Sequence, residues 1–188
     1  GWSLSTTNYN CDVFALHKDL DNQVVNNADA PLNLFREASE FITQKMLLRM
    51  ELQWVTDYFA TSIWDSNVTP TNLWSDYATS DPVDDVELGK ETILQNTGYE
   101  PNTLVLGYQV FRKLKQHPDV IDRIKYTQSA VNAVTEDLLA ALFGVQKVLV
   151  AKAIKATNAE GATAAYAFTH GKHALLCYVA PNPGLMTA

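Results

Sequence analysis

The sequence predicts an α+β fold in which one long helix precedes a compact unit of alternating helices and strands. Between Leu32 and Ile63 the chain has neither glycine nor proline, and apolar residues recur there at intervals of three and four. Beyond residue 80, short apolar runs alternate with helical segments that begin and end at capping and turn residues. We therefore divide the chain into residues 1–80, which hold the helix and a linker, and residues 81–188, an α/β domain.

Residues 1–28 are rich in Asn, Asp, Ser and Thr and contain only short apolar runs, at 13–16 and at Val24-Val25. This pattern predicts one or two short strands in an extended segment. The long helix should follow directly. Asp29 can cap its N-terminus and Pro31 suits its first turn, so we expect an unbroken helix from about Asp29 to Ile63, about 45–50 Å long.

The linker over 65–82 is polar and carries Trp74 and Tyr77. After it, Asp81-Pro82 should open a helix that Gly98 closes in the left-handed conformation. The remaining elements follow from similar signals. We expect strands at 103–106, 148–150 and 174–179, helices around 110–114 and 120–124 and after Thr135, an exposed loop at 126–134, and a turn at 158–163.

The composition is that of an ordinary globular protein, with 47% hydrophobic and 19% charged residues. A net charge of -7 argues against a nucleic-acid binder that works through a broad basic surface. This net charge is compatible with a protein that encloses nucleic acid without binding it tightly. Two cysteines are too few for a disulfide scaffold, and no apolar run reaches the roughly 20 residues of a membrane span.

No catalytic or cofactor-binding pattern stands out. The strand-to-helix join at Gly107 has one glycine where a dinucleotide fingerprint needs three. His170, His173 and Cys177 are the one cluster of soft ligands, but an extended segment spreads them too far for one tetrahedral ion. We interpret them as a buried cysteine and two histidines on a surface turn. The acidic run from Asp81 to Glu87 is interpreted as helix-dipole compensation rather than a cation site. We expect no catalytic, cofactor or metal site.

The segment from Asp81 onward resembles the major capsid proteins of tailed bacteriophages. In that family an aspartate-led helix leads into a strand entry of the form G-x-x-P-N-x-x-V, which residues 98–105 are similar to. The run at 111–118 and the Leu139–Val150 segment also resemble the family's usual continuation. The long helix resembles the spine helix of its peripheral domain, and the likeness covers most of 29–180 in the order of the elements.

The resemblance implies a phage major-capsid-like fold, with a peripheral portion and an axial α/β domain. It implies a structural subunit, not an enzyme, of a bacteriophage or prophage capsid that needs no cofactor. Copies would form pentamers and hexamers of an icosahedral shell that encloses DNA without sequence-specific binding. The protein would be found in the virion capsid and, during assembly, in the host bacterial cytoplasm. The alternatives are an encapsulin-like compartment shell, a tail or accessory virion protein, and a small α/β enzyme or ligand-binding domain.

The exposed loop at 126–134 should lie at the tip of the axial domain, near the symmetry axis of the ring. The residues expected to contact neighbouring subunits there are Lys125, Tyr126, Thr127, Gln128, Ser129 and Asn132. The family's N-terminal arm and closing peripheral strand are not evident in this sequence. We therefore expect a fragment of a longer subunit, monomeric or in small oligomers when isolated.

Overall fold

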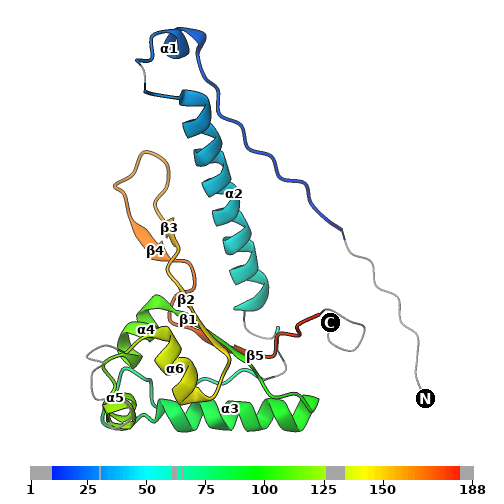
Figure 1. Cartoon of the computed structure of the whole chain (residues 1–188), viewed down its shortest axis with the longest axis vertical. Helices are drawn as coiled ribbons and strands as arrows, with labels where there is room; N and C mark the ends of the chain where they lie inside the picture. Colours follow the sequence, from blue (N-terminus) through cyan, green and yellow to red (C-terminus); the bar gives the residue numbers. More distant parts are fainter. Residues whose placement is uncertain (1–9, 30, 61–62, 65, 126–133, 183–188) are drawn as a thin grey trace, which may run out of the picture. The chain divides into compact units, whose positions relative to one another are not determined.

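The structure is a computed structural model, and it describes residues 10–29, 31–60, 63–64, 66–125 and 134–182 (Figure 1). The chain divides into two compact units, Gly1–Met50 and Glu51–Ala188. The boundary between them falls within a long helix, so it differs from the division at residue 80 that the sequence predicts between a peripheral portion and an axial domain. The division at residue 80 stays a prediction.

The first unit contains a short helix, α1 (Asn22–Asn26), preceded by extended chain. The Asp21 side chain caps α1 by accepting a 2.9 Å hydrogen bond from the backbone N–H of Gln23. In residues 10–28 the structure has no strand, so the prediction of strands is wrong for this part. Val24 and Val25 belong to α1, because a local cap outweighs the strand preference of two β-branched residues.

The long helix, α2 (Leu34–Tyr58), is unbroken over 25 residues but shorter at both ends than the sequence suggests. Asn33, not Asp29, caps it: the Asn33 side chain accepts a 3.1 Å hydrogen bond from the N–H of Arg36. The Asp29 carbonyl instead closes a turn with the N–H of Leu32. The position of this helix along an edge of the molecule stays a prediction.

In the second unit, helix α3 (Pro82–Thr97) confirms the capping argument at both ends. The Asp81 side chain accepts hydrogen bonds from the N–H groups of Val83 and Asp84, and Pro82 occupies the first turn. Gly98 ends the helix with φ 74°, in the left-handed region that favours glycine.

A three-stranded sheet has the order β2-β1-β5, formed by β1 (Thr103–Gly107), β2 (Lys147–Ala151) and β5 (Ala174–Cys177). The central strand β1 is buried along its whole length and runs parallel to β2 and antiparallel to β5. All three strands were predicted. A parallel pair needs a long crossover, which the helices between β1 and β2 provide.

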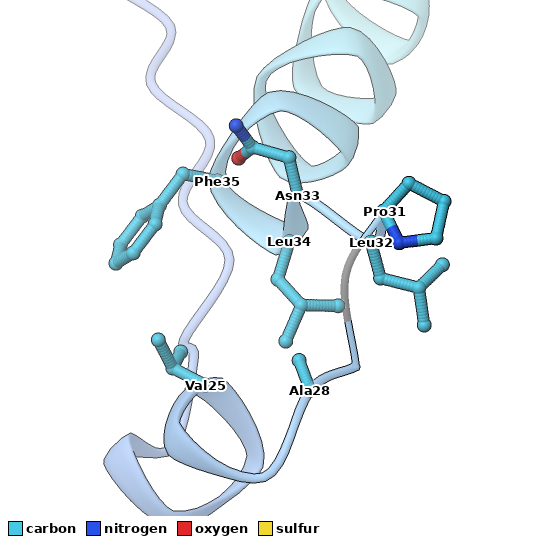
Figure 2. A pocket seen from close by; sticks show the side chains of 7 residues that line it. All are labelled: Val25, Ala28, Pro31, Leu32, Asn33, Leu34 and Phe35. Atoms are coloured by element: carbon cyan, nitrogen blue, oxygen red, sulfur yellow. The ribbon is translucent and has the colours of Figure 1, made fainter.

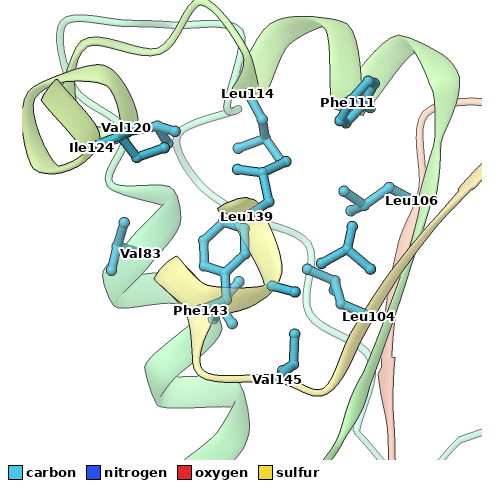
Figure 3. Packing of buried hydrophobic residues seen from close by; sticks show 13 residues of the cluster. Val83, Leu104, Leu106, Phe111, Leu114, Val120, Ile124, Leu139, Phe143 and Val145 are labelled. Carbon is cyan, nitrogen blue, oxygen red and sulfur yellow. The ribbon is translucent and has the colours of Figure 1, made fainter. Parts of the chain in front are cut away.

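The crossover consists of α4 (Tyr108–Leu114), α5 (Pro118–Lys125) and α6 (Glu136–Phe143). Thr135 caps α6 and Gly144 ends it at φ 62°, as predicted. Side chains from these helices, from α3 and from the sheet form one hydrophobic core (Figure 3). Phe143 at its centre is fully buried. Val134, the last residue of the predicted exposed loop, packs partly buried against this core.

Two strands that the sequence did not indicate, β3 (Ile154–Ala156) and β4 (Tyr166–Phe168), form an antiparallel hairpin. The predicted turn at 158–163 lies between them. Apart from half-buried Phe168, the residues of both strands are exposed. None of the described helices is both long and apolar enough to cross a bilayer.

Candidate functional site

One buried histidine connects the linker before α3 with the junction of α4 and α5. His117 is completely buried, and its Nε2 lies 3.0 Å from the hydroxyl oxygen of Ser80. Its Nδ1 lies 3.5 Å from a carboxylate oxygen of Asp119. A serine, a histidine and an aspartate in this order have the composition of a hydrolase triad.

The tautomer of His117 that its hydrogen bonds indicate leaves this serine without activation. The backbone N–H of Asp119 donates to Nδ1 of His117 at 3.3 Å, so Nδ1 carries a lone pair and the proton is on Nε2. The Nε2–H then donates to the Ser80 hydroxyl, which itself donates to the carbonyl of Asp76 at 2.6 Å. A general base needs a free lone pair toward the serine, and this imidazole has none. The arrangement caps α5 and fixes the linker.

A second buried histidine, His170, lies in the turn between β4 and β5 and is 2% exposed. Its Nδ1 lies 3.0 Å from the Thr169 hydroxyl and 3.4 Å from a Glu51 carboxylate oxygen. The rings of Trp54 and Phe59 pack on it, with centroids 5.5 and 5.0 Å away. Burial lowers the pKa of His170, and the nearby Glu51 charge partly opposes this.

The interpretation of His170 as a surface-turn residue is therefore wrong, whereas His173 is exposed. His170 directly precedes Gly171, which has φ 59°, and its inward position depends on packing against Trp54 and Phe59, which no local sequence signal marks. Cys177 is half-buried, and burial raises the pKa of its thiol. In the part of the chain that the structure describes, no three His, Cys, Asp or Glu side chains could hold a metal ion. The absence of a bound metal stays a prediction.

Two surface hollows are of different chemical character. The first lies in the first unit, between α1 and the start of α2, and Asn33 is its one polar side chain (Figure 2). Its lining residues are Val25, Ala28, Pro31, Leu32, Asn33, Leu34 and Phe35. The second runs along the outer face of α3 and combines exposed leucines with carboxylates. We call it the α3 groove; it is lined by Asp84, Glu87, Leu88, Lys90, Glu91, Leu94 and Glu100.

Among the residues that line the α3 groove, one is basic, and it already forms ion pairs within the subunit. Lys90 Nζ lies 3.1 Å from Glu87 and 3.8 Å from Glu100, and it donates to the carbonyl of Phe143 at the end of α6. The acidic run from Asp81 to Glu87 was interpreted as helix-dipole compensation, so the α3 groove was not predicted from the sequence. The available signal was the spacing of Leu88 and Glu91 after Asp84, four and then three residues, which places all three on one helical face.

Comparison with known proteins identifies the family. The sequence model of the family described as phage major capsid protein E matches residues 49–182. The chain belongs to the phage major capsid protein E family. A major capsid protein of Burkholderia phage BcepMu is 39% identical over 102 residues, which are 54% of this chain and 31% of that protein.

A solved structure supports the fold of this capsid-family chain. The crystal structure of a phage-related protein from Bordetella bronchiseptica RB50 superposes with a TM-score of 0.69 at 28% identity. The superposition covers 82% of this chain and 51% of that one. The chain therefore spans between about a third and a half of the length of these relatives. The α+β class and the family resemblance predicted from the sequence are confirmed.

The contact segment predicted for this capsid-family chain is only partly visible. Lys125 is the last residue of α5 and forms a 2.6 Å ion pair with Asp122. The other predicted contact residues, Tyr126, Thr127, Gln128, Ser129 and Asn132, lie outside the described residues. Their role in subunit contacts stays a prediction.

Proposed function

We propose that this chain is part of a structural subunit that assembles with copies of itself into the icosahedral shell of a bacteriophage or prophage. The family match over residues 49–182 carries the proposal. Subunits would form pentamers and hexamers and enclose the genome without reading its sequence. The protein would act in the virion capsid, after assembly in the cytoplasm of the host bacterium.

Exposed apolar side chains support an assembling protein. On α2, Phe35, Leu47 and Met50 are all more than half exposed, with Met50 at 68%. A soluble monomer rarely leaves so many large apolar side chains along one helix open to water, and such surfaces mark protein contacts. Neighbouring subunits would cover them.

The proposed role involves no catalysis. The Ser80–His117–Asp119 arrangement has the composition of a triad, but its hydrogen bonds hold the serine as a donor to the carbonyl of Asp76. A buried histidine that caps a helix and anchors a linker serves the stability of a shell subunit.

We also propose that the subunit has the two portions predicted from the sequence. Residues 1–80 would belong to a peripheral portion with the spine helix, and residues 81–188 to an axial domain. The segment from Lys125 to Asn132 would contact neighbours around the ring axis. Shortening this loop and reversing the charge of Lys125 should impair ring closure without changing the melting temperature of the subunit.

Expression of the intact gene product that carries this sequence tests the proposal. Electron microscopy and sedimentation velocity should show closed icosahedral particles, and nuclease treatment should leave protected DNA in particles from induced lysogens. Particles loaded with a protein cargo and no DNA would favour the encapsulin-like alternative. A product that stays monomeric at every salt and protein concentration would overturn the assignment as a shell subunit.

A further inference from the structure

We infer that the α3 groove of one copy binds the basic edge formed by α4 and α5 of the next copy. This inference rests on the proposed shell function and names the surfaces that would join neighbouring subunits within a ring. The occupant is a second copy of this chain, because the chain itself carries the complementary charge.

The charges of the two surfaces are opposite. Residues 81–100, which include α3, contain six carboxylates and one lysine. Residues 108–125, which include α4 and α5, contain five lysines and arginines and two aspartates. Between partners, such complementarity steers association and selects one register of docking.

The helix dipole explains only part of the acidic surface. Asp84 lies in the first turn of α3, where a negative charge is favoured. Glu91 lies in the second half of the helix and Glu100 lies beyond its C-terminus, where the dipole disfavours a carboxylate. Asp85 differs from the groove residues, because its carboxylate accepts a 2.6 Å hydrogen bond from the indole of Trp74. The dipole therefore does not account for the charges toward the end of the groove.

The groove also exposes apolar surface that α3 does not bury in its own unit. Leu88 is 60% exposed and Leu94 is 48% exposed, and both lie among the carboxylates. An apolar centre with a charged rim is the usual composition of a protein contact. On the basic side, α5 contributes Ile121, which is 41% exposed. The apolar parts of both surfaces can therefore be buried together.

The basic edge has charges that the subunit leaves unpaired. Arg112 and Lys115 are exposed, and within the described ranges neither forms an ion pair. Lys115 instead lies over the ring of Phe111, with Nζ 5.5 Å from the ring centroid. Asp84 in the groove likewise has no cationic partner in the part of the chain described. Both surfaces therefore have charges available for a neighbour.

The two surfaces occupy different parts of the same unit. In Figure 1, α4 and α5 lie toward the N-terminal end of α3, whereas the groove continues along α3 to Glu100 beyond its other end. A contact between two different surfaces of identical copies is heterologous, and it closes into a ring when the rotation between copies is a fraction of a full turn. Pentamers and hexamers are rings of this kind.

Charge reversal tests the inference in the intact gene product. One variant, Arg112→Glu with Lys115→Glu, makes the edge acidic, and another, Asp84→Lys with Glu91→Lys, makes the groove basic. Each alone should give at least about tenfold fewer particles at ~50 mM salt, because like charges then face each other. The control, Lys155→Glu with Lys172→Glu, makes the same charge change as the edge variant at exposed residues outside both surfaces. It should assemble normally.

Mixing the two variants gives the decisive readout. An acidic edge then meets a basic groove, and a basic edge meets an acidic groove, if the variants alternate around a ring. Alternation is possible in a ring of six and impossible in a ring of five. The mixture should therefore form hexamers but not pentamers, whereas all four substitutions in one chain should restore both.

The outcomes separate the inference from the proposed function. If the unaltered protein forms shells and both variants form them equally well, the groove is not the contact and the shell function stands. If each variant fails and mixing restores nothing, the inference is also overturned. If the unaltered protein never assembles, the proposed function fails first. Melting temperatures of all variants, measured on dissociated subunits, should stay within about 5 °C of that of the unaltered subunit, since a helix-dipole contribution at Asp84 or Arg112 shifts it by only a few degrees; this excludes misfolding as the cause.

Discussion

The Nε2 atom of His117 lies 3.0 Å from the Ser80 hydroxyl oxygen, in a contact buried from water. The two residues are 37 positions apart, so this contact fixes the linker before α3 to the junction of α4 and α5. The ring of Tyr77 packs edge-on against the same imidazole, with centroids 5.4 Å apart. One histidine thus caps a helix and anchors the aromatic end of a linker.

His117→Ala should lower the free energy of unfolding by about 2–4 kcal/mol. The substitution removes the cap of α5 and leaves the Ser80 hydroxyl with one partner fewer. His117→Asn should cost less, because asparagine is a preferred N-cap and can accept from the N–H of Asp119. Urea denaturation of the three proteins measures the difference. Equal losses for alanine and asparagine would show that the cap contributes nothing.

Gly107→Ala should destabilise the protein more than Gly98→Ala. A Cβ at position 107 would collide with the carbonyl oxygen of Gly171, which is backbone and has little room to move. At Gly98 nothing lies within 4 Å of an added Cβ, so the cost there is only that of the left-handed φ, about 1 kcal/mol. Thermal unfolding of both variants checks the order. A smaller loss at position 107 would mean that the β1 end and the 171 turn separate easily.

Capping chemistry explains which elements could be predicted from the sequence. Asp81 with Gly98, and Thr135 with Gly144, define α3 and α6 by contacts within a few residues. The start of α2 was misplaced because Asp29, Pro31 and Asn33 all suit a helix N-terminus, and only the structure shows that Asn33 caps it. Such a choice depends on chain geometry before the helix, which no local pattern records.

Elements and contacts that depend on distant parts of the chain were not predictable. The hairpin of β3 and β4 pairs short, mostly exposed strands, so it lacks the apolar alternation that marks a half-buried strand. The inward position of His170 depends on Trp54 and Phe59, more than 100 residues earlier. The composition of the α3 groove was visible, but its complement on α4 and α5 becomes evident only when both surfaces are placed in one unit.

The unfolding free energy should fall as the pH drops below about 6.5, the ordinary pKa of histidine. Burial lowers the pKa of His170 in the folded protein, so over the window below 6.5 the unfolded chain binds a proton that the folded chain does not. The contribution of neutral His170 to the unfolding free energy is therefore fully present above that pH, and it is lost as the pH falls toward the lowered pKa of His170 in the folded protein. Denaturation between pH 7.5 and 5 measures this slope.

Glu51→Gln should make the same pH dependence steeper. The Glu51 carboxylate, 3.4 Å from Nδ1, raises the pKa of His170 and thereby opposes the effect of burial. Its removal leaves desolvation unopposed, so the folded pKa falls further. His170→Gln should remove this part of the slope. A slope that is unchanged in both variants would assign the pH dependence to other groups.

The two thiols should differ in reactivity, because Cys11 is exposed and Cys177 is half-buried on β5 opposite Thr103 of β1. Burial raises the pKa of the Cys177 thiol, and the thiolate is the reactive form. At pH 7.5, iodoacetamide should therefore modify Cys11 at least about tenfold faster than Cys177, since both access and ionisation favour the exposed residue. Peptide mass spectrometry over a time course measures the two rates, and Cys11→Ser gives the slow reaction alone.

In 8 M urea the rates should converge, because the sheet that shields Cys177 is gone. Equal rates in the folded protein would show that β5 leaves β1 readily, which would contradict the position of this strand at the edge of a stable sheet.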